Sequence, residues 1–266
     1  MTTVTGTLRR PARELPIFYL AMAGIFAAIA FAGFTPGYLL PVAMHRFDGP
    51  ALVHLHGILL FGWMVLLVWQ SGLVRRRRIE AHRAWGMAGI SLATAVVFTT
   101  MALIVRGLEA AHAAGNYDRL RLPAIALLSQ IALFAVFVAA AVASVRRPET
   151  HRRLMLLATA NLLPPAVARL FGLVLGLVLA PPDAGRRNIA LVTNVDLAFT
   201  VTLTAALVVD LLIVAAIVRD WRTRGRPHAA YVVGGACMLT VQLLRKPFAY
   251  TPLWHWITDG FLALAR

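Results

Sequence analysis

Residues 52–70 read LVHLHGILLFGWMVLLVWQ, a run of sequence that is apolar enough to enter a lipid bilayer. A helix of about 20 apolar residues crosses the hydrocarbon core of a membrane, which is about 30 Å thick. The run nevertheless contains two histidines, two tryptophans and a glutamine. Lipid cannot satisfy these polar groups, so each of them needs a neighbouring helix, a water-filled cavity or a bound cofactor.

The apolar character of this run extends over most of the chain. Of the 266 residues, 60% are hydrophobic and only 14% are charged, and the mean hydropathy is +0.75. Backbone groups inside lipid must be satisfied within their own segment, so the spans are expected to be helices. The sequence therefore predicts an all-α, polytopic transmembrane helix bundle that forms one domain over residues 1–266. Seven spans are predicted, at residues 17–40, 51–74, 86–107, 122–145, 153–179, 190–218 and 229–248.

The two ends of the chain and its single cysteine narrow the interpretation. The first 15 residues lead into a full-length span without a small-residue cleavage site, so this span is expected to be retained. The tail after the last span is too short to cross again, and Trp254 and Trp256 favour an interfacial position. Cys237 is the only cysteine, which excludes an intrachain disulfide. Phosphate-binding loops, HExxH and zinc-finger spacings are absent from the sequence.

The arginines predict the orientation in the membrane. Cytoplasmic loops of membrane proteins carry an excess of Lys and Arg. With the N-terminus inside, sixteen arginines fall in cytoplasmic segments, namely Arg9, Arg10, Arg13, Arg75, Arg76, Arg77, Arg78, Arg83, Arg146, Arg147, Arg152, Arg153, Arg219, Arg222, Arg224 and Arg226. Six fall in the opposite loops, namely Arg46, Arg106, Arg119, Arg121, Arg186 and Arg187. The sequence therefore predicts a cytoplasmic N-terminus.

The net charge of +15 raises the question of nucleic-acid binding. The basic residues lie in short loops beside the span ends, where they set the topology and meet anionic lipid headgroups. We therefore expect anionic lipids as partners and no nucleic acid.

The polar residues of the second span share one face. His56, Trp63 and Gln70 are spaced by seven residues, which is nearly two helical turns. We expect this stripe to face the interior of the bundle, and His54 to point away from it. Gln70 is expected to bond across to another helix, as polar side chains in spans commonly do.

The histidines divide into two levels of the membrane. His82, before the third span, and His151, at the start of the fifth, are expected on the inner side. His56 and His112 are expected on the outer side, together with His45 and His54. Most of the membrane thickness would separate the two levels, which excludes one metal cluster drawn from both and permits two separate sites.

Three charged residues are predicted inside the membrane. Arg169 follows Pro164 and Pro165 in the fifth span, where an unpaired charge costs roughly 3 kcal/mol on insertion scales. Asp196 of the sixth span is expected at a similar depth, so the sequence predicts an Arg169–Asp196 contact. Asp210 is fourteen residues further along and should share the stripe of Asp196, nearer the cytoplasm.

Short motifs carry a family resemblance from about residue 50 to residue 255. HG at 56–57, HRAWG at 82–86, PETHRRLMLLAT at 148–159 and ARL at 168–170 resemble a group of bacterial multi-pass membrane proteins of uncharacterised function. The resemblance implies the cytoplasmic (inner) membrane of a bacterium. The chain is more distantly similar to diheme b-type membrane cytochromes, in which a four-helix core binds each heme through two histidines from non-adjacent helices.

The cytochrome resemblance implies heme b as cofactor and assigns residues to it. His82 and His151 would be the iron ligands of an inner heme. His56 would ligate an outer heme together with His112, which substitutes for a histidine that the fourth span lacks. Arg169 would serve the outer propionates, and Arg152 and Arg153 the inner ones. A structural role without metal ligation stays open for these histidines, namely a contact with lipid phosphate, a helix cap or an interhelical hydrogen bond.

Three functions are compatible with the sequence. The first is heme-binding electron transfer, in which case any enzymatic activity would be that of a membrane oxidoreductase. The second is a proton-coupled transporter or carrier that uses Arg169, Asp196, Asp210 and Gln70. The third is an accessory structural subunit of a larger membrane complex.

Overall fold

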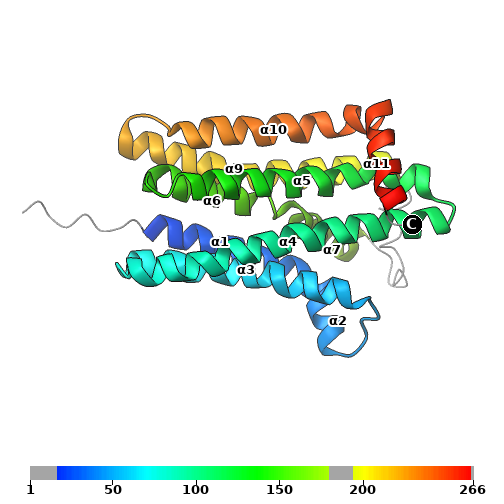
Figure 1. Ribbon diagram of the computed structural model, residues 1–266, viewed down its shortest axis with the longest axis horizontal. Helices are drawn as coiled ribbons and strands as arrows, with labels where there is room; N and C mark the ends of the chain where they lie inside the picture. The colour runs from blue at the N-terminus through cyan, green and yellow to red at the C-terminus, as the bar shows by residue number, and fades with distance from the viewer. Residues whose placement is uncertain (1–16, 180–193, 265–266) are drawn as a thin grey trace, which may run out of the picture.

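The computed structural model describes residues 17–179 and 194–264, and every element in these ranges is helical (Figure 1). Most of the helices run side by side along the long axis of the molecule. The elements are α1 (Ile17–Phe34), the π-helical turn η1 (Thr35–Leu39), α2 (Leu40–Ala43), α3 (Ala51–Arg75), α4 (Ile79–Ala113), α5 (Tyr117–Ala143), α6 (Pro148–Ala160), α7 (Pro164–Leu179), α9 (Val195–Arg224), α10 (Ala229–Ala249) and α11 (Pro252–Leu264).

Five helical segments of the described chain are long and apolar enough to cross a membrane. They are Ile17–Ala43, α3, α4, α5 and α9, and the bent pair of α6 and α7 makes a sixth if it counts as one span. The fold therefore suits an integral membrane protein. The predicted count of seven is not confirmed: α10 forms as one helix and packs on α5 and α9, but it is not among these segments.

Several helices extend beyond the predicted spans. α4 begins at Ile79 rather than at residue 86, so His82 lies in its first turns instead of before the helix. The same helix runs to Ala113, so His112 lies in its last turn. Hydropathy marks only the part of a helix that suits hydrocarbon, whereas the helix itself continues into the headgroup region, where charged and polar residues are tolerated.

The predicted fifth span is broken into α6 and α7. Proline has no backbone N–H and disfavours a helical residue before it, and Pro164 begins α7. The two helices are bent by about 40°. Across the break, the Asn161 side chain donates to the Gln130 carbonyl at 2.6 Å, and the Gln130 side chain donates to the Asn161 carbonyl at 3.3 Å. The bond from Gln130 satisfies the Asn161 carbonyl, which lies at the break, and the two bonds together join the break to α5.

α6 occupies the centre of the bundle. It packs on α1, α5, α9 and α10, and its residues Leu157 and Ala158 are fully buried. α1 in turn packs on α3 and α7. Gly33 of α1 faces the backbone of α7, where a Cβ would lie 2.7 Å from the Ala166 Cα. Only glycine allows the two helices to approach this closely.

Figure 1 shows that α4, α6 and α10 begin at the same end of the bundle, where α3, α5 and α9 finish. We name this end the basic end, because the arginines of residues 75–78, 146–153 and 219–226 belong to it. At the other end α11 crosses the long helices. Its Trp254 is 1% exposed and donates to the Arg121 carbonyl at 3.0 Å, whereas Trp256 is 75% exposed. The interfacial position of this segment stays a prediction.

Candidate functional site

The polar stripe of α3 faces the interior of the bundle, as predicted. Trp63 is 2% exposed and donates through Nε1 to Thr159 Oγ1 of α6 at 3.1 Å. Its ring also meets Phe134 of α5 edge to face, with ring centres 5.0 Å apart. Trp63 therefore connects three helices at the middle of the bundle.

The two histidines of α3 have different partners. His56 Nδ1 lies 3.1 Å from Thr99 Oγ1 of α4, whereas His54 Nδ1 lies 3.1 Å from the hydroxyl of Tyr38 in η1. The His54 ring also packs edge to face on Phe47. The prediction that His54 points away from the stripe is confirmed, and in both imidazoles Nδ1 is engaged by a side-chain hydroxyl.

Gln70 ends the stripe at the basic end and holds His82. Its Oε1 lies 2.8 Å from His82 Nδ1, and its Nε2 donates to the His82 carbonyl at 3.2 Å. The predicted interhelical bond of Gln70 is therefore confirmed. Its partner is His82, and the bond fixes the orientation of that imidazole.

His82 of α4 and His151 of α6 lie next to each other. Their ring centres are 6.3 Å apart and the ring planes are inclined by 82°. His151 Nδ1 lies 2.8 Å from the Ala141 carbonyl of α5. In both residues Nδ1 is engaged, and Nε2 forms no hydrogen bond within the described part of the chain. The predicted inner pair is thus brought together.

The predicted outer pair is not formed. His56 contacts Thr99, and His112 lies thirteen residues further along the same helix, which corresponds to about 20 Å. The His112 ring packs instead on Tyr117, with ring centres 5.7 Å apart. The prediction of an outer site with both histidines is therefore wrong. The prediction fails because α4 is long, so that His112 lies well beyond the level of His56.

The predicted Arg169–Asp196 contact is also wrong. Arg169 donates to the Pro165 carbonyl at 2.9 Å, and its guanidinium lies 4.3 Å from the centre of the Phe34 ring. Asp196 instead pairs with Lys246 of α10 at 2.8 Å. Arg169 thus faces α1 while Asp196 faces α10.

The predicted shared stripe of the two aspartates is confirmed. Asp210 accepts from Gln242 Nε2 at 3.3 Å, so Asp196 and Asp210 both face α10. This stripe brings Asp196 and Asp210 against polar side chains of α10.

A buried ion pair at the basic end escaped the sequence prediction. Arg153 and Asp220 are 0% and 1% exposed. Arg153 donates through Nε to one carboxylate oxygen of Asp220 at 2.7 Å and through Nη2 to the other at 2.6 Å. Such bidentate pairs are the strongest arginine contacts with carboxylates. The motif at 148–159 is therefore explained in part by packing, because Arg153 joins α6 to α9.

Glu149 completes this cluster. Its Oε2 accepts from Arg153 and Arg152 at 2.7 and 2.6 Å and also from Arg224 of α9. His228, in the loop between α9 and α10, belongs to the same region. Burial, together with the positive charges of Arg153 and Arg224, lowers the pKa of His228, so this imidazole is neutral at pH 7.

The cluster also limits what could bind at this end. Arg153 is fully engaged by protein carboxylates, so of the two predicted propionate donors only Arg152 is left partly accessible. Within residues 17–179 and 194–264, no three or more His, Cys, Asp or Glu side chains lie close enough to hold a metal ion. His82 and His151 could therefore supply only two ligands to a metal ion, and its other ligands would have to come from a cofactor.

Comparison of the chain with family models, with curated proteins and with solved structures finds no match. The function is therefore argued from the geometry of the chain alone.

Proposed function

We propose that this integral membrane protein transfers electrons and binds one b-type heme between His82 and His151 at the basic end. The spacing of the two rings carries the proposal. Two imidazoles on opposite sides of one metal ion, each with a metal–nitrogen distance of about 2 Å, have ring centres about 6 Å apart. The observed separation is 6.3 Å.

The surroundings of the two rings support the same assignment. A metal-bound imidazole usually donates its other N–H to a carbonyl or a similar acceptor, which fixes the tautomer and the ring orientation. Gln70 Oε1 and the Ala141 carbonyl are such acceptors, each 2.8 Å from an Nδ1. The pair comes from α4 and α6, which α5 separates in the chain, and this is the arrangement of the diheme b-type cytochromes that the sequence resembles. His82 and His151 are therefore the residues that would hold the heme iron.

The chain's own residues would orient and shield the group. Gln70 and Ala141 hold the imidazoles, Arg152 supplies a cation for a propionate, and the apolar side chains of α3 and α5 exclude water. Heme, when bound, supplies one-electron chemistry that the chain's own side chains lack. Because His56 and His112 are not brought together, one heme at the basic end is proposed rather than two across the bundle.

The arginine asymmetry completes the proposal. It supports a basic end at the cytoplasmic face of a bacterial inner membrane, against anionic lipids. Electron donors or acceptors, including subunits of a membrane complex, would then meet the protein at that face. The transporter hypothesis has lost its predicted Arg169–Asp196 pair.

The optical spectrum of the protein purified from heme-supplied cells tests the proposal. The wild-type protein should show the sharp reduced α-band of low-spin bis-imidazole iron. His151→Ala and His82→Ala should each abolish that band, because each removes one ligand. His54→Ala is the matched control, since His54 contacts Tyr38 at the other end of the bundle, and it should leave the band intact. A colourless wild-type protein would refute the proposal.

A further inference from the structure

A buried arginine lies near the far end of α10 from the basic end. The buried residues of α10 follow one helical stripe, formed by Tyr231, Gly234, Met238, Gln242, Arg245 and Ala249. Arg245 is 4% exposed and donates through Nε to Ser129 Oγ of α5 at 2.8 Å. Its Nη1 is buried and has no hydrogen-bond partner in the described part of the chain.

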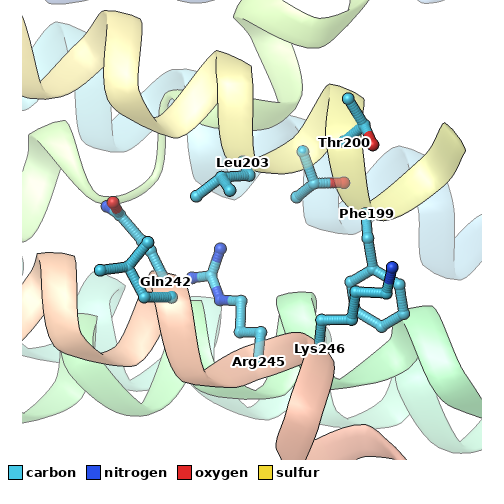
Figure 2. A pocket seen from close by; sticks show the side chains of 8 residues that line it. Phe199, Thr200, Leu203, Gln242, Arg245 and Lys246 are labelled. Atoms are coloured by element: carbon cyan, nitrogen blue, oxygen red, sulfur yellow. The ribbon is translucent and has the colours of Figure 1, made fainter. Parts of the chain in front are cut away.

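The guanidinium of Arg245 points into a cavity between α9 and α10. Figure 2 shows it directed between Gln242 and Leu203, toward α9. The cavity has a volume of about 100 Å³. Gln242 is 5% exposed, and its Oε1 also has no hydrogen-bond partner within the described residues. Two buried polar atoms, one donor and one acceptor, are therefore left unsatisfied at one cavity.

The charges around the cavity favour an anion. Its lining includes the cations Arg245 and Lys246 and no acidic side chain. Asp196 is paired with Lys246, and Asp210 accepts from Gln242. Asp210 attracts Arg245 through space but forms no hydrogen bond with it. Burying a cation without a hydrogen-bonded counter-ion is strongly unfavourable. A negatively charged acceptor at Arg245 Nη1 would therefore be stabilising.

The walls of the cavity define the rest of the ligand. Phe199, Leu203 and Leu243 present apolar surface beside the guanidinium. The cavity is larger than the share of one water molecule, about 30 Å³. We propose that this cavity binds a monocarboxylate, with its carboxylate on Arg245 Nη1 and its hydrocarbon part against these apolar side chains. The carboxylate can come from solution as a short-chain acid or from the bilayer as a fatty acid.

This site is separate from the proposed heme site. Arg245 lies sixteen residues after Ala229, the first residue of α10 at the basic end, which corresponds to about 24 Å along the helix. The inference therefore does not depend on heme binding. His151→Ala should leave carboxylate binding unchanged, which distinguishes failure of one proposal from failure of the other.

The test measures thermal unfolding of the purified full-length protein in a neutral detergent against increasing butyrate or laurate. A ligand that binds only the folded state raises the melting temperature in a saturable way. Saturation with butyrate supports a ligand from solution, and saturation with laurate alone supports a ligand from the bilayer. Sodium chloride at equal ionic strength is the salt control. An equal shift with chloride, or no saturable shift with either acid, would overturn the proposal.

Two variants locate the binding. Arg245→Gln should weaken carboxylate binding by about tenfold or more, because a hydrogen bond to a charged group is lost. Leu203→Trp should abolish it by filling the cavity while leaving Arg245 in place. Leu211→Trp is the matched control, since Leu211 is an exposed leucine of the same helix outside the cavity lining. Binding that survives both Arg245→Gln and Leu203→Trp would place the ligand elsewhere and overturn the assignment.

Discussion

Arg153 is the best-satisfied buried charge of the described chain. Four of its hydrogen bonds reach Asp220 and Glu149, and its guanidinium also lies 5.5 Å from the centre of the Tyr231 ring. These contacts join α6 to α9 and α10 at the basic end. A charge that is removed from water in this way is stable only while its partner is present.

Removing one member of the Arg153–Asp220 pair should be more harmful than removing both. Arg153→Leu alone should lower the free energy of unfolding by about 3–5 kcal/mol, because it strands a buried carboxylate. The double variant with Asp220→Leu should recover much of that loss. Unfolding in mixed detergent measures the cycle, and strictly additive effects would show that the two residues are not coupled.

Arg169 and Asp196 should behave as independent residues. They face different helices, so the effects of Arg169→Leu and Asp196→Leu on the free energy of unfolding should add to within about 0.5 kcal/mol. Asp196 should couple instead to Lys246, by no more than about 1 kcal/mol, because both side chains are exposed. Coupling between Arg169 and Asp196 above 1 kcal/mol would restore the original pairing.

At the scale of helices, close packing of α1 on α7 depends on one glycine. A methyl group at Gly33 would meet the backbone of Ala166, which cannot rotate away as a side chain can. α7 begins just after the break at Asn161–Leu163, so this contact also fixes the direction in which the chain leaves the break.

Gly33→Ala should therefore destabilise the protein by about 1–3 kcal/mol through overpacking. Gly24→Ala is the matched control on the same helix, because a Cβ there meets no atom within 4 Å. It should be neutral or slightly stabilising, since alanine has the higher helix propensity. Thermal unfolding of the two variants checks the difference, and equal stabilities would contradict the close approach.

At the scale of the whole molecule, the sequence is sufficient to predict helices, approximate spans and the direction of the α3 stripe. Apolar length and helical period depend only on local residues. Partners were harder to predict, because depth along a span does not determine the direction of a side chain around it. Arg169 and Asp196 were placed at one depth, yet they face α1 and α10.

Two buried arginines show what additional signal the sequence contains. Arg245 falls within the predicted span 229–248, and it continues the buried stripe of α10 three residues after Gln242. Helical periodicity could therefore have placed it inside. Arg153 pairs with a residue 67 positions away, and no local pattern selects that partner among the many arginines of the basic end.

The orientation remains a prediction of the arginine asymmetry. A reporter fused after Arg226 should appear on the cytoplasmic side, and one inserted near Asn116 should appear outside. Both positions lie in connections between described helices, at opposite ends of the bundle. Opposite labelling at either site would contradict the assignment of the basic end to the cytoplasm.

Electron paramagnetic resonance of the oxidised, heme-supplied protein tests the central claim most directly, because it reports both the presence of heme and the arrangement of its ligands. Iron held by both His82 and His151 would give a low-spin ferric signal. The signal should be lost or become high-spin in His82→Ala. A wild-type protein without any ferric heme signal, or with a high-spin signal only, would contradict ligation by His82 and His151.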